Sequence, residues 1–312
     1  MTQKVLIIRP GALGDTLVLL PALKNIGNRV HLMVAGREPG ISFLKKAGFY
    51  SVNMEGGGWY RVFQENPDSS AGLSVPPQNR VVAYMSDPDG RINENLKAYF
   101  PAAEVTVLSA YPAPEKKTHV ARYLCTTLAE AGLPVDPDCA MEQAKKKPLI
   151  DADAKRSSED RIVVHPGSGS PRKNFPPDFW VAFIERISRE PAMQVKGKRL
   201  VLLGPAEKDL RDFFRERISG ASEVAFCPRN EELLPFLETA RLYAGHDSGV
   251  THLAAMLGTP TLAVFREDNL PIWHPLGPVT RVIQSSNPDE ACLEKMVDAA
   301  KALIRRKRNH ER

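Results

Sequence analysis

The chain has 312 residues, of which 43% are hydrophobic and 25% charged, and these values exclude a disulfide-dependent miniprotein, a disordered chain and a coiled coil. Its 42 basic and 37 acidic residues give a formal net charge of +5, which suits an anionic ligand but does not imply nucleic acid. At about 100 to 200 residues per domain, we expect two soluble domains.

The cysteines and the N-terminal segment both favour a cytoplasmic protein. The four cysteines lie far apart, without a C-x-x-C pair or the spacing of a zinc site, so we expect reduced thiols. Charged residues, proline and glycine interrupt the first 23 residues, which therefore lack the apolar core of a signal peptide. No later stretch reaches the roughly 20 apolar residues that span a bilayer.

Short apolar runs alternate with helical periodicity along the first half of the chain. The runs predict strands at Val5–Ile8, Val30–Val34, Val81–Tyr84 and Glu104–Leu108, and helices after Thr16, at Pro39–Ala47 and at Thr118–Ala131. Between them, Glu55–Gln78 is rich in glycine, proline and serine and predicts a long irregular segment that is functional or mobile.

Residues Pro134–Asp160 have little apolar periodicity and predict a linker plus a surface segment, so we place a domain boundary at residue 150. Beyond this boundary, apolar runs again alternate with helical periodicity. Strands are predicted at Arg161–Val164, Arg199–Leu203, Leu242–Ala244 and Thr261–Phe265, with helices beginning near Pro177, Ala206 and Ser248. The sequence therefore predicts an α/β fold with two Rossmann-like domains, whose strand-end loops line one cleft between them.

The loop Arg9–Thr16 joins the first strand to the first helix, and Asp15 stands near the helix N-terminus. Asp15 can cap the helix, which contributes about 1 kcal/mol, or it can face the cleft as a general base. The pattern G-x-x-G-D is neither a dinucleotide fingerprint nor a P-loop, so the capping role is favoured from spacing alone.

Loops after later strands carry features of a diphosphate site. His165–Lys173 combines small residues, which expose backbone N–H groups, with two adjacent cations, although a solvated turn explains it equally well. Glu207 follows a strand, at a position where an acidic residue can bind a ribose. The alternative is an acid in the first turn of a helix, where it interacts favourably with the helix dipole. Neither loop has a Walker ending, so ATP hydrolysis is not supported.

A polar start followed by an apolar helix at Ala244–Ala255 predicts a helix N-terminus that can hold phosphate. His246, Asp247 and His252 have poor metal spacing, and we expect no metal. Ser248 and His252 are four residues apart, but no G-x-S-x-G elbow supports a hydrolase. The basic stretch Lys301–Arg312 is a solvated helix end or a contact with an anionic membrane.

Taken together, these motifs resemble the ADP-heptose:lipopolysaccharide heptosyltransferases of glycosyltransferase family 9. The resemblance rests on Ile8–Asp15 with Leu20–Leu23, on His165–Gly167 with Lys173, and on Asp247–Gly249 with His252–Ala255 and Leu257–Pro260. It implies a GT-B fold, with an N-terminal acceptor-side domain at residues 1–150 and a C-terminal donor domain at 151–312. An alternative is that the last helix packs back on the N-terminal domain.

The resemblance also implies an activity: an inverting, metal-independent transfer of a heptose or related sugar from an ADP-linked donor to a lipopolysaccharide inner-core or related glycan acceptor. It implies a cytoplasmic enzyme at the inner face of the inner membrane, with no cofactor and no nucleic acid partner. Asp15 looks like the general base and Lys173 like the cation that stabilises the donor phosphates. The expected donor-binding residues are Gly14, Ser168, Glu207, Asp247, Ser248, Gly249 and His252.

From charge alone, the candidates for contacting an acidic or phosphorylated acceptor are Arg61, Arg80, Lys116 and Lys117. Three positions depart from the family pattern: Asn174-Phe175 replaces a tryptophan, Phe265–Asn269 replaces a G-P-T-D-P-like loop, and His246 replaces Asn or a small residue. The alternatives are a nucleotide-sugar epimerase or hydrolase of the same fold and a non-catalytic nucleotide-sugar binder. A nicotinamide dehydrogenase is disfavoured because no G-x-G-x-x-G follows a strand.

Overall fold

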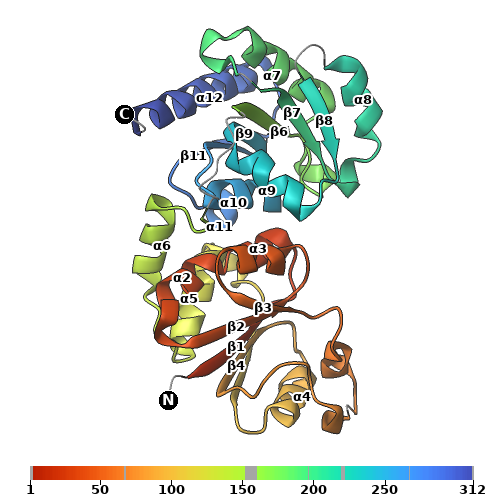
Figure 1. Ribbon diagram of the computed structural model, residues 1–312, viewed down its shortest axis with the longest axis vertical. Helices are drawn as coiled ribbons and strands as arrows, with labels where there is room; N and C mark the ends of the chain where they lie inside the picture. The colour runs from red at the N-terminus through yellow and green to blue at the C-terminus, as the bar shows by residue number, and fades with distance from the viewer. Residues whose placement is uncertain are drawn as a thin grey trace. The chain divides into compact units, whose positions relative to one another are not determined.

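The computed structural model describes residues 3–66, 68–151, 160–195, 197–218, 222–266 and 268–310. The chain divides into two compact units, Met1–Gln143 and Ala144–Arg312 (Figure 1). Each unit is built on one parallel sheet with helices on its faces, so the predicted α/β class is confirmed.

The first unit has a sheet in which every pair of neighbouring strands is parallel, in the order β3-β2-β1-β4-β5. Its strands are β1 (Lys4–Ile8), β2 (His31–Gly36), β3 (Tyr50–Asn53), β4 (Arg80–Tyr84) and β5 (Glu104–Leu108). Its helices are α1 (Leu13–Leu17), α2 (Leu20–Ile26), α3 (Gly40–Lys46), α4 (Arg91–Tyr99), α5 (Val120–Glu130) and α6 (Pro137–Lys146), whose last residues belong to the second unit.

Both faces of the first sheet are buried, which explains the continuous apolar runs of β1 and β4. Leu6 and Val81 pack in one cluster with residues of α4 and of the 3₁₀ helix Trp59–Phe63. Helices α2, α3 and α5 lie on the other side of the sheet (Figure 1).

The second unit has a six-stranded parallel sheet in the order β11-β10-β9-β6-β7-β8. Its strands are β6 (Arg161–His165), β7 (Arg199–Leu203), β8 (Ser222–Phe226), β9 (Ala240–His246), β10 (Thr261–Phe265) and β11 (Thr280–Gln284). Its helices are α7 (Pro177–Arg189), α8 (Leu210–Arg217), α9 (Asn230–Glu238), α10 (Gly249–Met256), α11 (Leu270–Trp273) and α12 (Glu290–His310).

Helices α7, α8 and α12 contribute to one large apolar cluster with alternate residues of β6, β7, β9 and β10. The last helix, α12, packs on α7 and on β9, β10 and β11, all within its own unit. None of the helices that the structure describes is long and apolar enough to cross a membrane.

In both sheets the strand order reverses beside the first strand, between β1 and β4 in one unit and between β6 and β9 in the other. In open α/β sheets the loops that leave such neighbouring strands in opposite directions open a crevice at the carboxyl ends of the strands. This topology brings together the loops after β1 and β4, and likewise the loops after β6 and β9.

The stretch Pro134–Asp160, predicted as a linker plus a surface segment, contains a helix, α6, that the sequence did not predict. The Asp136 side chain accepts hydrogen bonds from the backbone N–H groups of Asp138 and Cys139, and Pro137 is the first helical residue. The buried face of α6 consists of Ala140, Met141 and Ala144. Three apolar residues are too few to show a helical period in the sequence. Residues 152–159 of the predicted linker lie outside the described residues.

The segment Glu55–Gln78 is irregular as predicted, but it is anchored to the core. Trp59 and Val62 are almost fully buried in the cluster under α4. The side-chain amide of Asn95 on α4 donates to the carbonyls of Val62 (2.9 Å) and Gln64 (2.8 Å). These contacts hold the described part of the segment beside the carboxyl edge of the sheet.

Candidate active site

Asp15 is the third residue of α1, directly after the loop that leaves β1. Its Oδ2 accepts a hydrogen bond from the Ala12 backbone N–H (3.0 Å), so the capping role is formed. Its Oδ1 accepts one from the Tyr111 hydroxyl (2.9 Å). Gly11 is required here, because a Cβ at this position would lie 2.3 Å from the Asp15 Cβ. Gly14 precedes Asp15 within the same helix.

Arg9, which the sequence reasoning missed, lies under the Asp15 loop and is only 2% exposed. Its Nε donates to the Asp15 carbonyl (2.6 Å) and its Nη1 to the Ala110 carbonyl (2.9 Å). Burial lowers the pKa of this guanidinium, and the nearby Asp15 carboxylate partly offsets that effect. The available signal was a cation at the end of an otherwise apolar strand.

A cavity of about 320 Å³, here called the Asp15 pocket, opens beside these groups. It is lined by Arg9, Pro10, Gly11, Asp15, Phe63, Tyr84, Met85, Ser86, Ile92, Ala110 and Tyr111. The lining comes from the loops after β1 and β4, where the strand order reverses, and from the segment after β5. Burial and the Asp15 charge raise the pKa of Tyr111, so its hydroxyl stays a hydrogen-bond donor at neutral pH.

The basic residues proposed from charge do not line this pocket. Arg80 begins β4, at the opposite edge of the sheet, and its guanidinium binds the Ala131 carbonyl and the Glu104 carboxylate. Arg61 donates to the Gly72 carbonyl (3.1 Å). Lys116 and Lys117 are exposed around the short 3₁₀ helix that precedes α5. Charge alone was therefore a weak guide to the position of these residues.

In the second unit, Lys173 and Asp247 form an ion pair across the loops after β6 and β9, with 2.6 Å between Nζ and Oδ2. Asp247 is buried, whereas the Lys173 side chain keeps 28% of its surface exposed. The Asn269 side-chain amide donates to the same Oδ2 (2.8 Å). A buried carboxylate therefore orients a partly exposed ammonium group, which remains able to meet an anionic ligand.

Glu207 is only 4% exposed and lies beneath the loop after β6. Its Oε2 accepts from the Gly204 backbone N–H (2.9 Å), which is the local capping contact. Gly167 touches it so closely that a Cβ there would lie 2.1 Å from the Glu207 Cδ. The Ser168 hydroxyl donates to the Asn174 side-chain oxygen (2.6 Å) and folds the loop upon itself.

Helix α10 begins at Gly249 and is capped by Ser248, whose hydroxyl accepts a hydrogen bond from the Thr251 N–H (3.3 Å). The same hydroxyl lies 3.4 Å from His165 Nδ1. His252 is buried, with its ring against Trp273 at 6.1 Å between centroids. The Ser248 hydroxyl thus contacts Thr251 and His165, and the His252 ring packs on Trp273.

His246, at the end of β9, is fully buried. Its Nε2 accepts two hydrogen bonds, from the Phe175 backbone N–H (2.9 Å) and from the Trp180 indole N–H (3.1 Å). The ring is therefore neutral with its proton on Nδ1, and burial lowers its pKa to about 3. Because Nε2 already serves two donors, His246 is a structural acceptor for the Lys173 loop. Among the described residues, no three His, Cys, Asp or Glu side chains are grouped as metal ligands.

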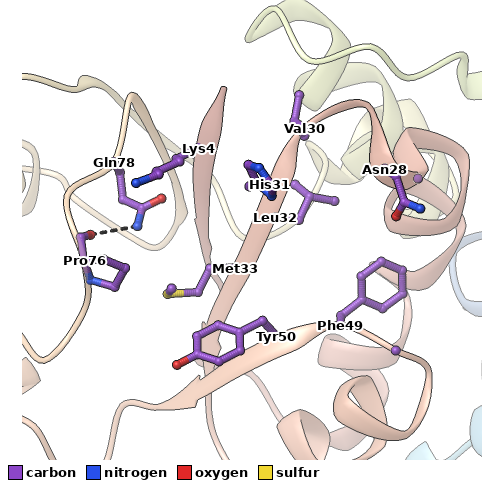
Figure 2. Close-up of a pocket in the computed structure, with 12 residues that line it drawn as sticks. Lys4, Asn28, Val30, His31, Leu32, Met33, Phe49, Tyr50, Pro76 and Gln78 are labelled. Carbon is purple, nitrogen blue, oxygen red and sulfur yellow. Dashed lines mark hydrogen bonds between the residues drawn. The ribbon is translucent and has the colours of Figure 1, made fainter. Parts of the chain in front are cut away.

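Another cavity, of about 390 Å³, lies at the amino ends of β1 and β2 and is lined partly by Lys4, His31 and Tyr50 (Figure 2). The Gln78 side chain donates to the Pro76 carbonyl (2.8 Å) at its margin (Figure 2). It contains none of the predicted site residues. Since ligands of parallel α/β sheets bind at the carboxyl ends of the strands, this cavity is not the candidate active site.

Comparison with known proteins gives a family and a fold. The model of glycosyltransferase family 9 (heptosyltransferase) matches residues 98–303. A glycosyl transferase family 9 structure from Veillonella parvula DSM 2008 aligns with a TM-score of 0.68 and 14% identity over 97% of each chain. E. coli ADP-heptose lps heptosyltransferase II aligns with a TM-score of 0.70 and 13% identity, covering 98% of this chain and 99% of that one.

E. coli heptosyltransferase WaaC, solved with ADP, aligns with a TM-score of 0.65 and 15% identity over 97% of this chain and 99% of that one. At these identities the structures establish the shared GT-B heptosyltransferase fold. A comparison with the sequences of curated proteins gives no match.

Proposed function

Because the chain belongs to glycosyltransferase family 9 (heptosyltransferase), we propose that it is an inverting glycosyltransferase that moves a heptose or related sugar. The proposed donor is ADP-linked, and the acceptor is a lipopolysaccharide inner-core or related glycan. One observation carries the proposal: the crevice of the first sheet holds the Asp15 carboxylate, and that of the second holds the Lys173–Asp247 pair.

In the proposed reaction, Asp15 accepts the proton of an acceptor hydroxyl as its oxygen forms a bond to the anomeric carbon of the donor. The bond from that carbon to the diphosphate oxygen breaks on the opposite face, and the diphosphate leaves with the electron pair. Lys173 offsets the negative charge that grows on the leaving group. This cation supplies the role for which other transferases use a metal, so we propose a metal-independent reaction.

Residues around Lys173 support a nucleoside diphosphate as the leaving group. The backbone N–H groups at the start of α10, near Ser248 and Gly249, suit phosphate oxygens. The second oxygen of Glu207 and the buried His252 complete the proposed donor site, with Glu207 on the ribose. The preference for ADP is supported by the fold shared with a protein that was solved with ADP.

We further propose that the enzyme works in the cytoplasm, at the inner face of the inner membrane. The four cysteines are free thiols, which is consistent with a reducing compartment. Basic residues at the C-terminus would favour an anionic surface. Of these, the side chains of Arg306, Lys307, Arg308 and Arg312 lie outside the described residues.

An Asp15→Asn substitution separates the two roles of this residue. Asparagine keeps an oxygen for the Ala12 N–H and thus the cap, but it cannot accept the acceptor proton. We expect sugar transfer to fall by about 10²-fold or more while ADP binding is unchanged. Transfer and the thermal midpoint would be measured together. Transfer at the parent rate by a folded Asp15→Asn protein would mean that Asp15 only caps the helix.

The donor is tested by the thermal midpoint of the protein with ADP, UDP and GDP, because a ligand that binds only the native state raises it. A selective rise with ADP that is lost in Lys173→Gln supports the proposed donor site. Release of free sugar from the donor without an acceptor would favour a hydrolase, and binding without turnover across many acceptors would favour a non-catalytic binder.

A further inference from the structure

The Asp15 pocket is the centre of a longer groove along the carboxyl edge of the first sheet. On one side, a cavity of about 650 Å³ that includes Tyr60 and Arg37 shares Pro10 and Phe63 with it. On the other side, a cavity of about 770 Å³ that includes Asp87 shares Met85, Ser86, Ala110 and Tyr111 with it. We call the three together the edge groove.

The charges that line the edge groove nearly cancel. Its cations are Arg9 and Arg37, and its anions are Asp15, Glu55 and Asp87, so two positive and three negative charges leave a net charge of −1. Arg37 is paired with Glu55 at 3.0 Å, and Arg9 lies beside Asp15. Recognition of a carboxylate or phosphate requires cations that are not already compensated in this way.

Aromatic rings are the exposed large hydrophobic side chains of the groove. Tyr60 is 62% exposed, Phe63 48% and Tyr111 45%, and all three line it. Arg61 does not line the groove; its guanidinium lies over the Tyr60 ring at 5.5 Å and is held by the Gly72 carbonyl. Rings exposed in this way offer flat apolar faces on which the C–H face of a sugar ring can pack.

Two buried polar atoms on residues that line the groove have no hydrogen-bond partner within the described part of the chain. One is Nη2 of Arg9, a donor, and the other is the side-chain oxygen of Asn93, an acceptor. A hydroxyl group can both donate and accept, so a ligand with several hydroxyls can satisfy both atoms. A carboxylate or phosphate group only accepts hydrogen bonds, so the Asn93 oxygen must be paired by a hydroxyl of the ligand.

We propose that the edge groove binds the acceptor as an uncharged saccharide. Its rings pack on Tyr60, Phe63 and Tyr111, and its hydroxyls pair with Arg9 and Asn93, which brings one hydroxyl to Asp15. This inference rests on the proposed function and refines it, because it assigns a neutral sugar, and not an acidic or phosphorylated one, to the reacting end of the acceptor.

Binding of two sets of saccharides to the full-length protein tests the inference. One set contains neutral hexose and heptose oligosaccharides, and the other contains the matched oligomers with uronate or phosphate groups. Titration calorimetry with ADP present gives the dissociation constant of each. We expect the neutral set to bind more tightly, with a dissociation constant that stays the same between about 0.1 M and about 1 M salt, where charge interactions are screened.

Exposed residues provide variants that should fold. We expect Tyr60→Ala and Phe63→Ala each to raise the dissociation constant of the neutral saccharide by about tenfold. Tyr50→Ala is the matched control, because Tyr50 is 65% exposed on the same unit but lines the cavity at the amino edge of the sheet (Figure 2). This control should bind like the parent.

Tighter and salt-sensitive binding of the charged oligomers would overturn the inference, as would equal binding by Tyr60→Ala, Phe63→Ala and the parent. Binding of neither set would overturn it too. Failure of the proposed function is seen separately, because it is read from ADP binding, which involves no acceptor, and from transfer by Asp15→Asn and the parent to one and the same acceptor.

Discussion

His246 shows how a single buried side chain can organise a loop, here the one that carries Lys173. Two departures from the family pattern, Phe175 and His246, contact each other directly: the backbone of one donates to the ring of the other, and the rings meet edge to face at 5.2 Å. The Trp180 indole completes the contact. The two departures therefore belong to one packing contact, and this contact fixes the backbone immediately after Lys173.

The buried histidines make the stability of the second unit depend on pH. Burial lowers the pKa of His165 to about 4 and that of His246 to about 3, from 6.5. Below pH 6.5 the unfolded chain therefore binds protons that the folded chain does not, so the free energy of unfolding falls as the pH is lowered. Each histidine should contribute on the order of 1 kcal/mol per pH unit.

This dependence is measured by denaturant unfolding at several values between pH 7 and pH 5, above the range in which carboxylates titrate. His246→Gln keeps an oxygen acceptor for the two N–H donors and removes one titrating group, so its slope should be smaller than that of the parent. A free energy of unfolding that is constant over this range in the parent would contradict the prediction.

At the scale of elements, the loops after the strands are positioned by close packing. Gly167 lies directly on the buried Glu207 side chain, so a side chain at residue 167 would have to displace Glu207 or the loops after β6 and β7. The edge strands show the opposite situation. All four are only partly buried, and a weaker apolar signal explains why the sequence did not predict β3, β8 and β11. The fourth, β5, was predicted from its run of apolar residues.

A Gly167→Ala substitution should force these loops apart. We expect a loss of about 1 to 3 kcal/mol in the free energy of unfolding, because the added methyl group collides with a buried carboxylate. ADP binding should weaken as well. In Gly167→Ala/Glu207→Ala the collision is removed, so Gly167→Ala should cost less in the Glu207→Ala background than in the parent. Equal costs in both backgrounds would show that the contact is not tight.

At the scale of the whole molecule, each unit has its own parallel sheet and its own apolar cluster. The proposed catalytic residues are divided between them, with Asp15 in the first unit and Lys173 in the second. Units with separate cores can in general fold alone.

We therefore expect residues 144–312, produced alone, to fold and to bind ADP with an affinity close to that of the full chain, but not to transfer sugar. Circular dichroism and calorimetry would measure folding and ADP binding. Transfer by this fragment would exclude Asp15 as the general base. A folded fragment without affinity for ADP would mean that the first unit contributes to the donor site.

The sequence alone predicted the α/β class, the central strands and the order of the motifs, because strands buried on both faces are continuous apolar runs and the chemistry follows them directly. It also placed Asp15, Lys173 and Asp247 in strand-end loops. It could not predict that Lys173 pairs with Asp247, 74 residues away, since that contact arises from the pairing of β6 with β9.

Tertiary structure alone decided the character of the proposed acceptor site. Net positive charge suggested Arg61, Arg80, Lys116 and Lys117, but charge along a chain does not tell which edge of a sheet a residue occupies, and Arg80 lies at the far edge. The Asp15 pocket instead gathers Arg9, Phe63 and Tyr111 from segments separated by dozens of residues. Such groupings depend on strand order and long-range packing, which local sequence patterns do not encode.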